Sequence, residues 1–136
     1  MPRVSNELDS QYWEPVATGP IAQADLTGSN TLGTAPSSIA ASGTWTSNLL
    51  PTDGFKVIAV GVTSSQAGVL SVQRYLDTAG LVAQGPPITQ AITAATPAVV
   101  NANDNAPAQS FKITITNTNG SSAATITNFA CLLNAQ

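Results

Sequence analysis

Three aspartates and one cysteine carry the side chains that could do chemistry in most of this sequence. Asp53, Asp77 and Asp104 each lie in a turn context, among Pro, Gly, Thr, Ala or Asn residues. Aspartate in such places usually bonds its own backbone, so we expect a turn role for each. Cys131 lies in a β-rich run, where a lone cysteine behaves as a small inert hydrophobe. A hydrolase or lyase that uses carboxylates is an alternative, and it requires two of these aspartates within about 10 Å of each other.

The residues that most catalytic centres need are missing. The chain has no histidine and one cysteine, which excludes a Ser-His-Asp triad, a Cys-His dyad, a histidine zinc site and a disulfide within the chain. It also has no phosphate-binding glycine spacing and no Gly-x-Ser-x-Gly elbow. Asn101, Asn103 and Asn105 flank Asp104, but one carboxylate is too few for a calcium site. The sequence therefore predicts a protein that is not an enzyme and that binds no cofactor or metal.

Charged residues are rare. The 136 residues include 4 Lys+Arg and 7 Asp+Glu, which is 8% of the chain, against about 25% in an average soluble domain. Four scattered basic residues cannot neutralise the phosphates on which nucleic-acid affinity mainly rests, so we expect no nucleic-acid partner. No run approaches the roughly 18 consecutive apolar residues of a membrane span, and no apolar signal segment follows Met1. We therefore expect no membrane partner, and assembly in a cytosol.

The first residues differ from the rest in charge and composition. Residues 1–25 hold four acidic residues and one basic residue, whereas the remaining residues hold three of each. Tyr12, Trp13 and Glu14 stand together in a polar stretch that contains Pro and Gly, where helix and strand signals are both weak. We interpret residues 1–40 as an extended N-terminal arm, acidic at its start. Its aromatic pair could dock on a neighbouring surface, fold back on its own domain or lie in a disordered segment.

From about residue 42 the chain divides into short β-rich runs separated by Gly, Pro, Asn and Asp. Residues 55–62 are apolar at almost every position, which predicts a central strand with both faces covered. Residues 69–76 and 111–116 alternate between apolar and polar, which predicts strands with one face in the core. In the last strand, the alternation lapses near Asn128, and this predicts a β-bulge. The remaining strand signals occupy residues 44–47, 88–93, 98–100 and, for that last strand, 124–133.

Two short segments predict tight connections between strands. Ser64–Gly68 has the length and the residues of a hairpin loop. Asn119-Gly120 is the strongest short hairpin signal, because both residues tolerate the positive φ of a type I′ turn. Prolines between the runs argue against long helices. The sequence thus predicts an all-β fold, in which residues 41–136 form an antiparallel β-sandwich or jelly roll of about seven or eight strands.

Large apolar side chains are few for a chain of this length. Small alanines fill out the 43% hydrophobic content, so the core has a modest supply of large side chains to bury. Burial against a partner subunit would supplement such a core. We therefore expect a homo-oligomer.

The run Ser42–Ser47, followed by Leu50–Phe55 and the stretch to Asp77, resembles the small β-rich virion proteins of tailed bacteriophages, most of all the capsid decoration, or cement, proteins. The likeness covers residues 42–133 and consists of Thr/Ala/Ser-rich strands, few charges and no reactive residues. The resemblance implies a non-enzymatic protein, often a homotrimer, that sits outside the capsid and locks neighbouring major capsid proteins together. Some such proteins have extended arms, and residues 1–40 would fit that role. The resemblance matches no functional residues.

Our leading hypothesis from the sequence is a structural virion protein on the capsid surface, assembled in the host cytoplasm. It would bind the major capsid protein through its arm and one face of the sandwich, since low charge and small polar residues suit a closely packed, wet surface. The alternative is a phage tail-tip or fibre protein that binds a host glycan, which would place Trp45 and Tyr75 together in an exposed groove. A scaffold protein of non-viral origin is not separated from the first hypothesis. The candidate partner-binding residues are Tyr12, Trp13, Glu14 and Trp45.

Overall fold

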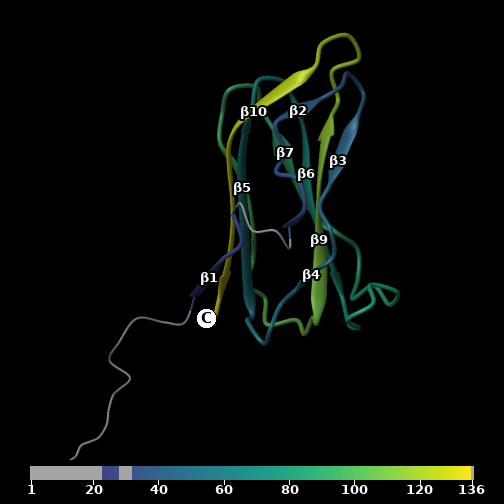
Figure 1. Cartoon of the computed structure of the whole chain (residues 1–136), viewed down its shortest axis with the longest axis vertical. Helices are drawn as coiled ribbons and strands as arrows, with labels where there is room; N and C mark the ends of the chain where they lie inside the picture. Colours follow the sequence, from purple (N-terminus) through teal and green to yellow (C-terminus); the bar gives the residue numbers. More distant parts are fainter. Residues whose placement is uncertain (1–22, 28–31, 136) are drawn as a thin grey trace, which may run out of the picture.

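Two antiparallel sheets face each other in the computed structural model of this chain, which describes residues 23–27 and 32–135 (Figure 1). The first sheet contains β1 (Gln23–Asp25), β2 (Ser38–Ile39), β5 (Val57–Ser64), β8 (Ala98–Ala102) and β10 (Ala124–Asn134). The second sheet contains β3 (Thr44–Thr46), β4 (Leu50–Pro51), β6 (Gly68–Tyr75), β7 (Ile88–Ile92) and β9 (Ser110–Asn117). Their strand orders are β1–β10–β5–β8, with β2 also on β10, and β3–β9–β6–β7, with β4 also on β9.

The connections between these strands are those of a jelly roll. The ten described strands occupy eight positions, because β1 and β2 both pair with β10 and β3 and β4 both pair with β9. Successive positions alternate between the two sheets, except that β6 and β7 are neighbours in one sheet. Two interleaved four-position sheets of this kind make a double-sheet jelly roll. The predicted all-β sandwich is confirmed, and eight of the ten strands follow residue 41.

The sandwich takes in residues that we expected to belong to the arm. β1 pairs with the end of β10, and β2 pairs with its beginning. Leu32 and Ile39 are buried in the core. The physical reason is the length of β10, since a long edge strand leaves its backbone N–H and C=O groups unpaired unless further strands cover it. The described residues before position 41 therefore extend the sheet instead of preceding it.

The long strands of both sheets bury every second residue. In β9 the buried Phe111, Ile113 and Ile115 alternate with half-buried Lys112, Thr114 and Thr116, as the sequence predicts. β6 follows the same alternation, with Leu70 and Val72 buried. The pairing of β10 with β5 shifts register between Ile126 and Asn128, which confirms the predicted bulge.

β5 is a central strand, as predicted, but the prediction that both of its faces are covered is wrong. It lies between β10 and β8 in the first sheet, with Ile58, Val60 and Val62 buried between the sheets. The residues on its other face are half-buried, and they point away from the second sheet. An almost wholly apolar strand is typical of a sheet covered on both sides. Within the described part of the chain, this strand is covered on one side only.

Ser64–Gly68 and Asn119-Gly120 reverse the chain, but they do not form the predicted hairpins. β5 and β6 lie in different sheets, as do β9 and β10, so each segment crosses between sheets. Neither Asn119 nor Gly120 takes the positive φ of a type I′ turn. The Asn119 carboxamide oxygen instead accepts hydrogen bonds from the backbone N–H groups of Ser121 and Ser122, at 2.8 and 2.9 Å. Asn119 thus forms a local Asx-type turn. This turn is part of the longer connection that leads from one sheet to the other.

Buried Asn117 secures the crossing from β9 to β10. Its side-chain nitrogen lies within hydrogen-bonding distance of the carbonyl oxygens of Ile39 and Ala40, both at 3.2 Å, and of Ser122, at 2.9 Å. Its carboxamide oxygen accepts from the backbone N–H of Asn119 at 3.0 Å. A buried polar side chain with all its groups paired fixes the geometry around it. Asn117 thereby ties the chain after β2 to the connection that precedes β10.

Gly68 begins β6 at the other crossing, and we expect Gly68→Ala to destabilise the fold by about 1 to 3 kcal/mol. The reason is a clash, because a Cβ at this position would overlap the carbonyl oxygen of Thr116. Gly61→Ala is the matched control, because its Cβ would meet a methyl group of Val99 at an ordinary 3.5 Å. That variant should be neutral or more stable by about 0.4 to 1 kcal/mol. Urea unfolding compares the two, and equal stabilities would contradict the clash.

Candidate interaction surfaces

The predicted partner-binding residues divide into three that lie outside the described residues and one that lies within the sandwich. Tyr12, Trp13 and Glu14 fall outside the described part of the chain. Trp45 lies in β3, and its ring contacts that of Phe129 in β10 edge to face, with centroids 5.6 Å apart and planes at 71°. Its Nε1–H donates to the carbonyl oxygen of Thr34 at 3.0 Å. The half-buried indole thus packs against the core and joins the two sheets.

Trp45 and Tyr75 do not share a groove. Trp45 is opposite Ile115, which is opposite Leu70, and both of these partners are buried. Tyr75 lies in β6 an odd number of residues beyond Leu70, so it points to the other face of the sheet. The arrangement that would favour a glycan platform, with two exposed aromatic rings side by side, is therefore not formed by this pair.

The side chains of Asp77 and Asp104 have the predicted turn roles. The Asp77 carboxylate accepts hydrogen bonds from the backbone N–H groups of Leu81 and Val82, both at 3.0 Å for the nearer oxygen. The N–H of Val82 contributes most to lowering the pKa of this carboxyl. Asp104 accepts from the backbone N–H of Ala106 at 3.2 Å. Asp53 sits at a positive φ of 51° in the turn after β4, a conformation that aspartate tolerates better than most residues.

Asp104 has a second role that the sequence does not reveal. Its two carboxylate oxygens accept hydrogen bonds from the guanidinium of Arg74, at 2.7 and 3.0 Å. Arg74 stands on the inward face of β6 and is 7% exposed, whereas the Asp104 side chain is 57% exposed on the loop after β8. This bidentate pair joins the two sheets. It explains why a basic residue occupies an apolar position of β6, and the Arg74 guanidinium holds the pKa of the Asp104 carboxyl well below its usual range.

Cys131 is buried in β10 without exposed surface. Burial raises the pKa of its thiol to about 12, and the charge of Asp25 adds to this effect. The thiolate, which is the reactive form, is therefore scarce at neutral pH. No group of three His, Cys, Asp or Glu side chains able to hold a metal ion occurs among residues 23–27 and 32–135. The same residues include no helix long and apolar enough to cross a membrane.

The outward side of the second sheet is a surface rich in hydroxyl groups, which we call the hydroxyl face. Strand pairing aligns two rows across β3, β9, β6 and β7. The first row runs across the strands as Thr44, Thr116, Val69 and Ala91. The second row runs as Thr46, Thr114, Ser71 and Thr89, and all four of these residues carry a hydroxyl group. Lys112 is the one charged side chain on the outward positions of β9. The hydroxyl-bearing residues of the two rows are Thr44, Thr46, Ser71, Thr89, Thr114 and Thr116.

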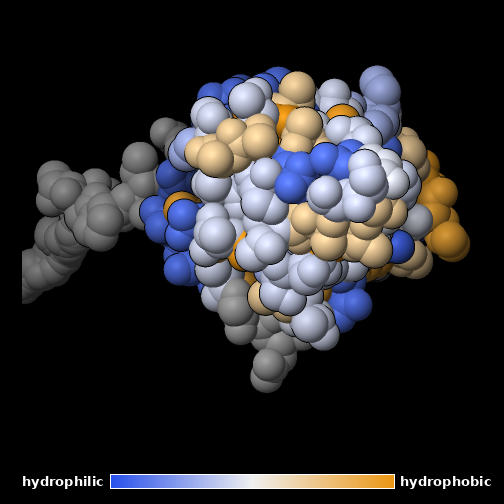
Figure 2. All heavy atoms as spheres, turned by 90° about the horizontal axis from the view of Figure 1, so that it is seen from above, coloured by the Kyte–Doolittle hydropathy of each residue, from blue (hydrophilic) through white to orange (hydrophobic). Residues whose placement is uncertain are grey.

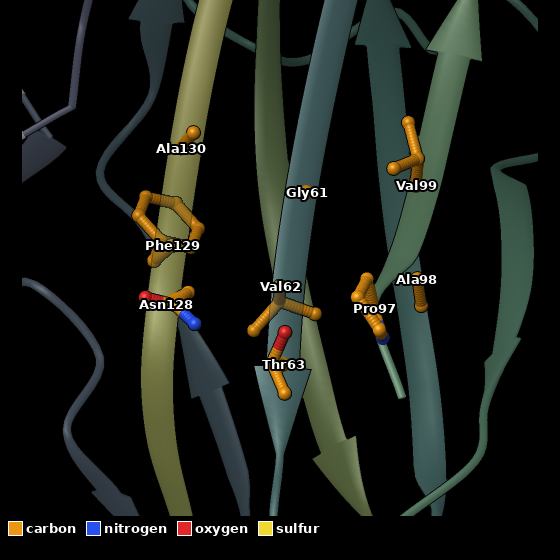
Figure 3. Close-up of a pocket in the computed structure, with 9 residues that line it drawn as sticks. All are labelled: Gly61, Val62, Thr63, Pro97, Ala98, Val99, Asn128, Phe129 and Ala130. Atoms are coloured by element: carbon orange, nitrogen blue, oxygen red, sulfur yellow. The ribbon is translucent and has the colours of Figure 1, made fainter. Parts of the chain in front are cut away.

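The outward side of β10, β5 and β8 in the first sheet is chemically different, and we call it the uncharged face. Strands β5, β8 and β10 contain no Asp, Glu, Lys or Arg. Exposed Asp25 of the edge strand β1, which is opposite Leu132, lies at the margin of this face. One row across these strands consists of Ala130, Gly61 and Val99. Because Gly61 has no side chain, the middle of the row is recessed, and a hollow of about 430 Å³ lies there (Figure 3). A second hollow, of about 280 Å³, lies further along the same face, and amide side chains such as Gln23, Asn101 and Asn134 line much of it.

The loop between β6 and β7 carries exposed apolar residues that the sequence analysis did not single out. Leu81 is 83% exposed, Val82 is 51% exposed and Leu76 is 44% exposed. Figure 2 shows hydrophobic atoms projecting from one side of a surface that is otherwise mostly pale or blue. This is the side from which the β6–β7 loop extends in Figure 1. The pair Leu81-Val82 could have indicated this exposure from the sequence, because apolar residues inside a turn segment have no strand that would bury them.

We expect Asp104→Asn to lower the midpoint of thermal unfolding by several degrees at neutral pH, because it removes the charged partner of the buried Arg74 guanidinium. The folded-state pKa of Asp104 is lowered from 3.8, so its contribution to stability is present above that pH and is lost as the pH falls through the folded pKa. The difference between the variant and the native chain should therefore shrink in acid. A difference that stays constant down to strongly acidic pH would contradict the ion pair.

We expect the thiol of Cys131 to resist alkylating reagents in the native protein and to react fully in denaturant. Its burial and raised pKa leave it without access and without thiolate. Mass spectrometry after a timed pulse of iodoacetamide measures the labelled fraction. Rapid labelling of the folded chain would show that β10 opens locally.

Comparisons of the chain with protein-family models, with curated proteins and with solved structures gave no significant match.

Proposed function

We propose that this protein is a non-enzymatic structural component of a bacteriophage virion. It binds the outside of the capsid and stabilises contacts between major capsid proteins, after assembly in the host cytoplasm. The observation that carries this proposal is the hydroxyl face, a four-stranded surface with two aligned rows of mostly Thr and Ser side chains. The other surfaces and the use of the ionisable groups support it.

The hydroxyl face suits adhesion by area and not by charge. Threonine and serine hydroxyls each donate and accept hydrogen bonds and can do so directly or through water. A wide surface of small polar groups therefore packs closely on a partner that is itself wet. With Lys112 as the charged residue at its margin, such a surface attaches without strong dependence on the partner's charge.

Structural use of the ionisable groups favours a non-enzymatic protein. The Asp77 carboxylate is bound to backbone N–H groups, Asp104 is paired with Arg74, and the Cys131 thiol is buried with a raised pKa. General acid-base catalysis needs a group that is free to exchange a proton with a substrate. In this fold these three groups stabilise the structure instead.

The N-terminal residues supply a second contact in this proposal. The described chain enters the sandwich at Gln23, at the edge of the first sheet beside the end of β10. Tyr12, Trp13 and Glu14 precede that point by about ten residues, which in extended form reach roughly 30 Å. Aromatic residues of this kind are frequent anchors of interfaces. They would bind a neighbouring capsid protein beyond the footprint of the sandwich.

Jelly rolls occur in both capsid and lectin domains, so the fold alone does not decide between the capsid and glycan hypotheses. The glycan-binding tail-tip or fibre protein is less favoured, because Trp45 and Tyr75 point to opposite sides of the second sheet. The two hypotheses differ in copy number. A capsid-surface protein is present in purified virions in many copies, whereas a tail protein is present in few.

We expect Thr114→Lys to weaken binding to capsids about tenfold or more, because it places a long charged side chain in the middle of the hydroxyl face. Thr114 lies in β9 between Thr46 and Ser71. Thr125→Lys is the matched control, since Thr125 is an exposed threonine in β10 of the other sheet. Cosedimentation with capsids that lack this protein measures binding. Equal binding of both variants would remove the hydroxyl face as the contact.

We expect deletion of residues 1–22 to leave the sandwich folded and to weaken capsid binding. The deletion keeps β1, whose pairing with β10 belongs to the first sheet. Circular dichroism monitors the fold, and the same cosedimentation assay measures attachment. Unchanged attachment would show that Tyr12, Trp13 and Glu14 do not contact the capsid.

A further inference from the structure

All four large hydrophobic residues that are exposed in the described chain belong to two places. Leu76, Leu81 and Val82 lie on the β6–β7 loop, and Val99, which is 55% exposed, lies beside the larger hollow of the uncharged face. Exposed apolar groups of a soluble protein scatter singly unless they serve an interaction. Their restriction to one projecting loop and one recess suggests that these two places are complementary.

The β6–β7 loop is held rigidly, so that its apolar tip projects in a defined position. The Asp77 carboxylate accepts hydrogen bonds from the N–H groups of Leu81 and Val82. The backbone N–H of Leu76 donates to the carbonyl oxygen of Val82 at 2.9 Å. Below them, the Ser110 hydroxyl donates to the carbonyl oxygen of Asp77 at 2.6 Å. A tip fixed in this way loses little conformational entropy when it binds.

The hollow of the uncharged face is shaped to receive an apolar side chain. Gly61 forms its floor, with Val99 of β8 on one side and Ala130 of β10 on the other (Figure 3). Pro97 contributes further apolar surface to its lining, and Thr63 and Asn128 contribute polar groups. None of the described residues that line it is charged, so an apolar group that enters it displaces water without stripping an ion of its hydration.

The pattern of β5 indicates that this face is covered in the working protein. Val57, Ala59 and Gly61 point outward from the first sheet and are half-buried in the single chain. Strands that are apolar on both faces belong to sheets covered on both sides. A surface that supplies the second cover must itself be apolar and uncharged, as the tip of the β6–β7 loop is, because Asp77 is its one charged residue and is turned to the backbone.

We propose that the protein associates with itself head to tail, with Leu81 and Val82 of one copy seated in the hollow above Gly61 of the next copy. We choose a second copy as the partner because one chain carries both the exposed apolar tip, on a loop of the second sheet, and a hollow without charged lining, on the outward side of the first. One chain therefore presents both complementary surfaces in different places. Such a contact is heterologous, and repeated use of it gives a closed ring or an open filament. A ring of three would be the homotrimer that the resemblance to capsid decoration proteins implies.

This contact uses the uncharged face, so it leaves the hydroxyl face of every copy free. Capsid binding then uses the rows of the hydroxyl face, whereas self-association uses the uncharged face of one copy and the β6–β7 loop of the next. The inference does not rest on the proposed function, because the isolated chain should associate without any capsid protein. Failure of one proposal is therefore separable from failure of the other.

Sedimentation velocity of the full chain over a range of concentrations tests the contact. The native chain should associate as its concentration rises, into a discrete ring or a growing series of oligomers, and Leu81→Ser should raise the dissociation constant about tenfold or more. Gly61→Val should have the same effect by filling the hollow, since a Cβ at this position meets only ordinary contacts in the fold. Thr114→Lys, which alters the hydroxyl face, should associate as the native chain does. Circular dichroism and thermal unfolding establish that each variant is folded.

An exchange of charges distinguishes this contact from nonspecific association. Leu81→Glu and Val99→Lys should each abolish the oligomer, because each places a single charge in an apolar contact. The chain that carries both substitutions should recover association, because the introduced carboxylate of one copy would then face the introduced ammonium group of the next. A native chain that sediments as a monomer at every concentration would overturn the proposal. So would folded Leu81→Ser and Gly61→Val variants that associate like the native chain.

Discussion

The structure depends on one constraint, which is that its core is a single layer of side chains between two sheets. Each long strand supplies only every second residue to that layer, and the residues it buries are Leu, Val, Ile, Phe and Ala with one Cys. Because the layer is thin, the two sheets must stay in register along their whole length for those few side chains to meet. The outward residues have no part in the core, so their chemistry is free to serve other roles.

Two polar interactions, that of Asn117 and that of Arg74 with Asp104, keep the sheets in register where apolar packing ends. At one crossing, Asn117 binds the backbone on both sides of the sandwich. Elsewhere, the guanidinium of Arg74 reaches from β6 to Asp104 beyond the end of β8. Burial of such groups is costly unless every donor and acceptor is paired. Each of these interactions therefore strongly favours one alignment of the two sheets over others nearby. The two polar interactions thus define the alignment of a core that is otherwise built from apolar side chains of similar kind.

Local patterns in the sequence are sufficient to predict where the strands lie, but they do not predict which strands pair with each other. The alternation in residues 111–116 and its lapse near Asn128 depend on which face of one strand is buried, and both predictions are confirmed. Asn119-Gly120 specifies a reversal of the chain, but a reversal serves equally well within a ladder, over about 5 Å, or between sheets, over about 10 Å. The same limit applies to the site, because Arg74 and Asp104 are thirty residues apart and Ala130, Gly61 and Val99 meet only through strand order.

The two outward faces divide the low charge of the chain into two kinds of surface. On the second sheet, hydroxyl groups keep their hydrogen-bonding capacity, so this face gains by contact with a polar, hydrated partner. On the first sheet, the outward row of Ala130, Gly61 and Val99 is small and apolar, so that row gains by excluding water and by close fit. A further charged residue in the middle of either surface would impair it, since charge binds water strongly on the first sheet and selects partners on the second. The scarcity of charge is therefore a property of the surfaces as much as of the core, and it agrees with the contacts that we propose for both of them.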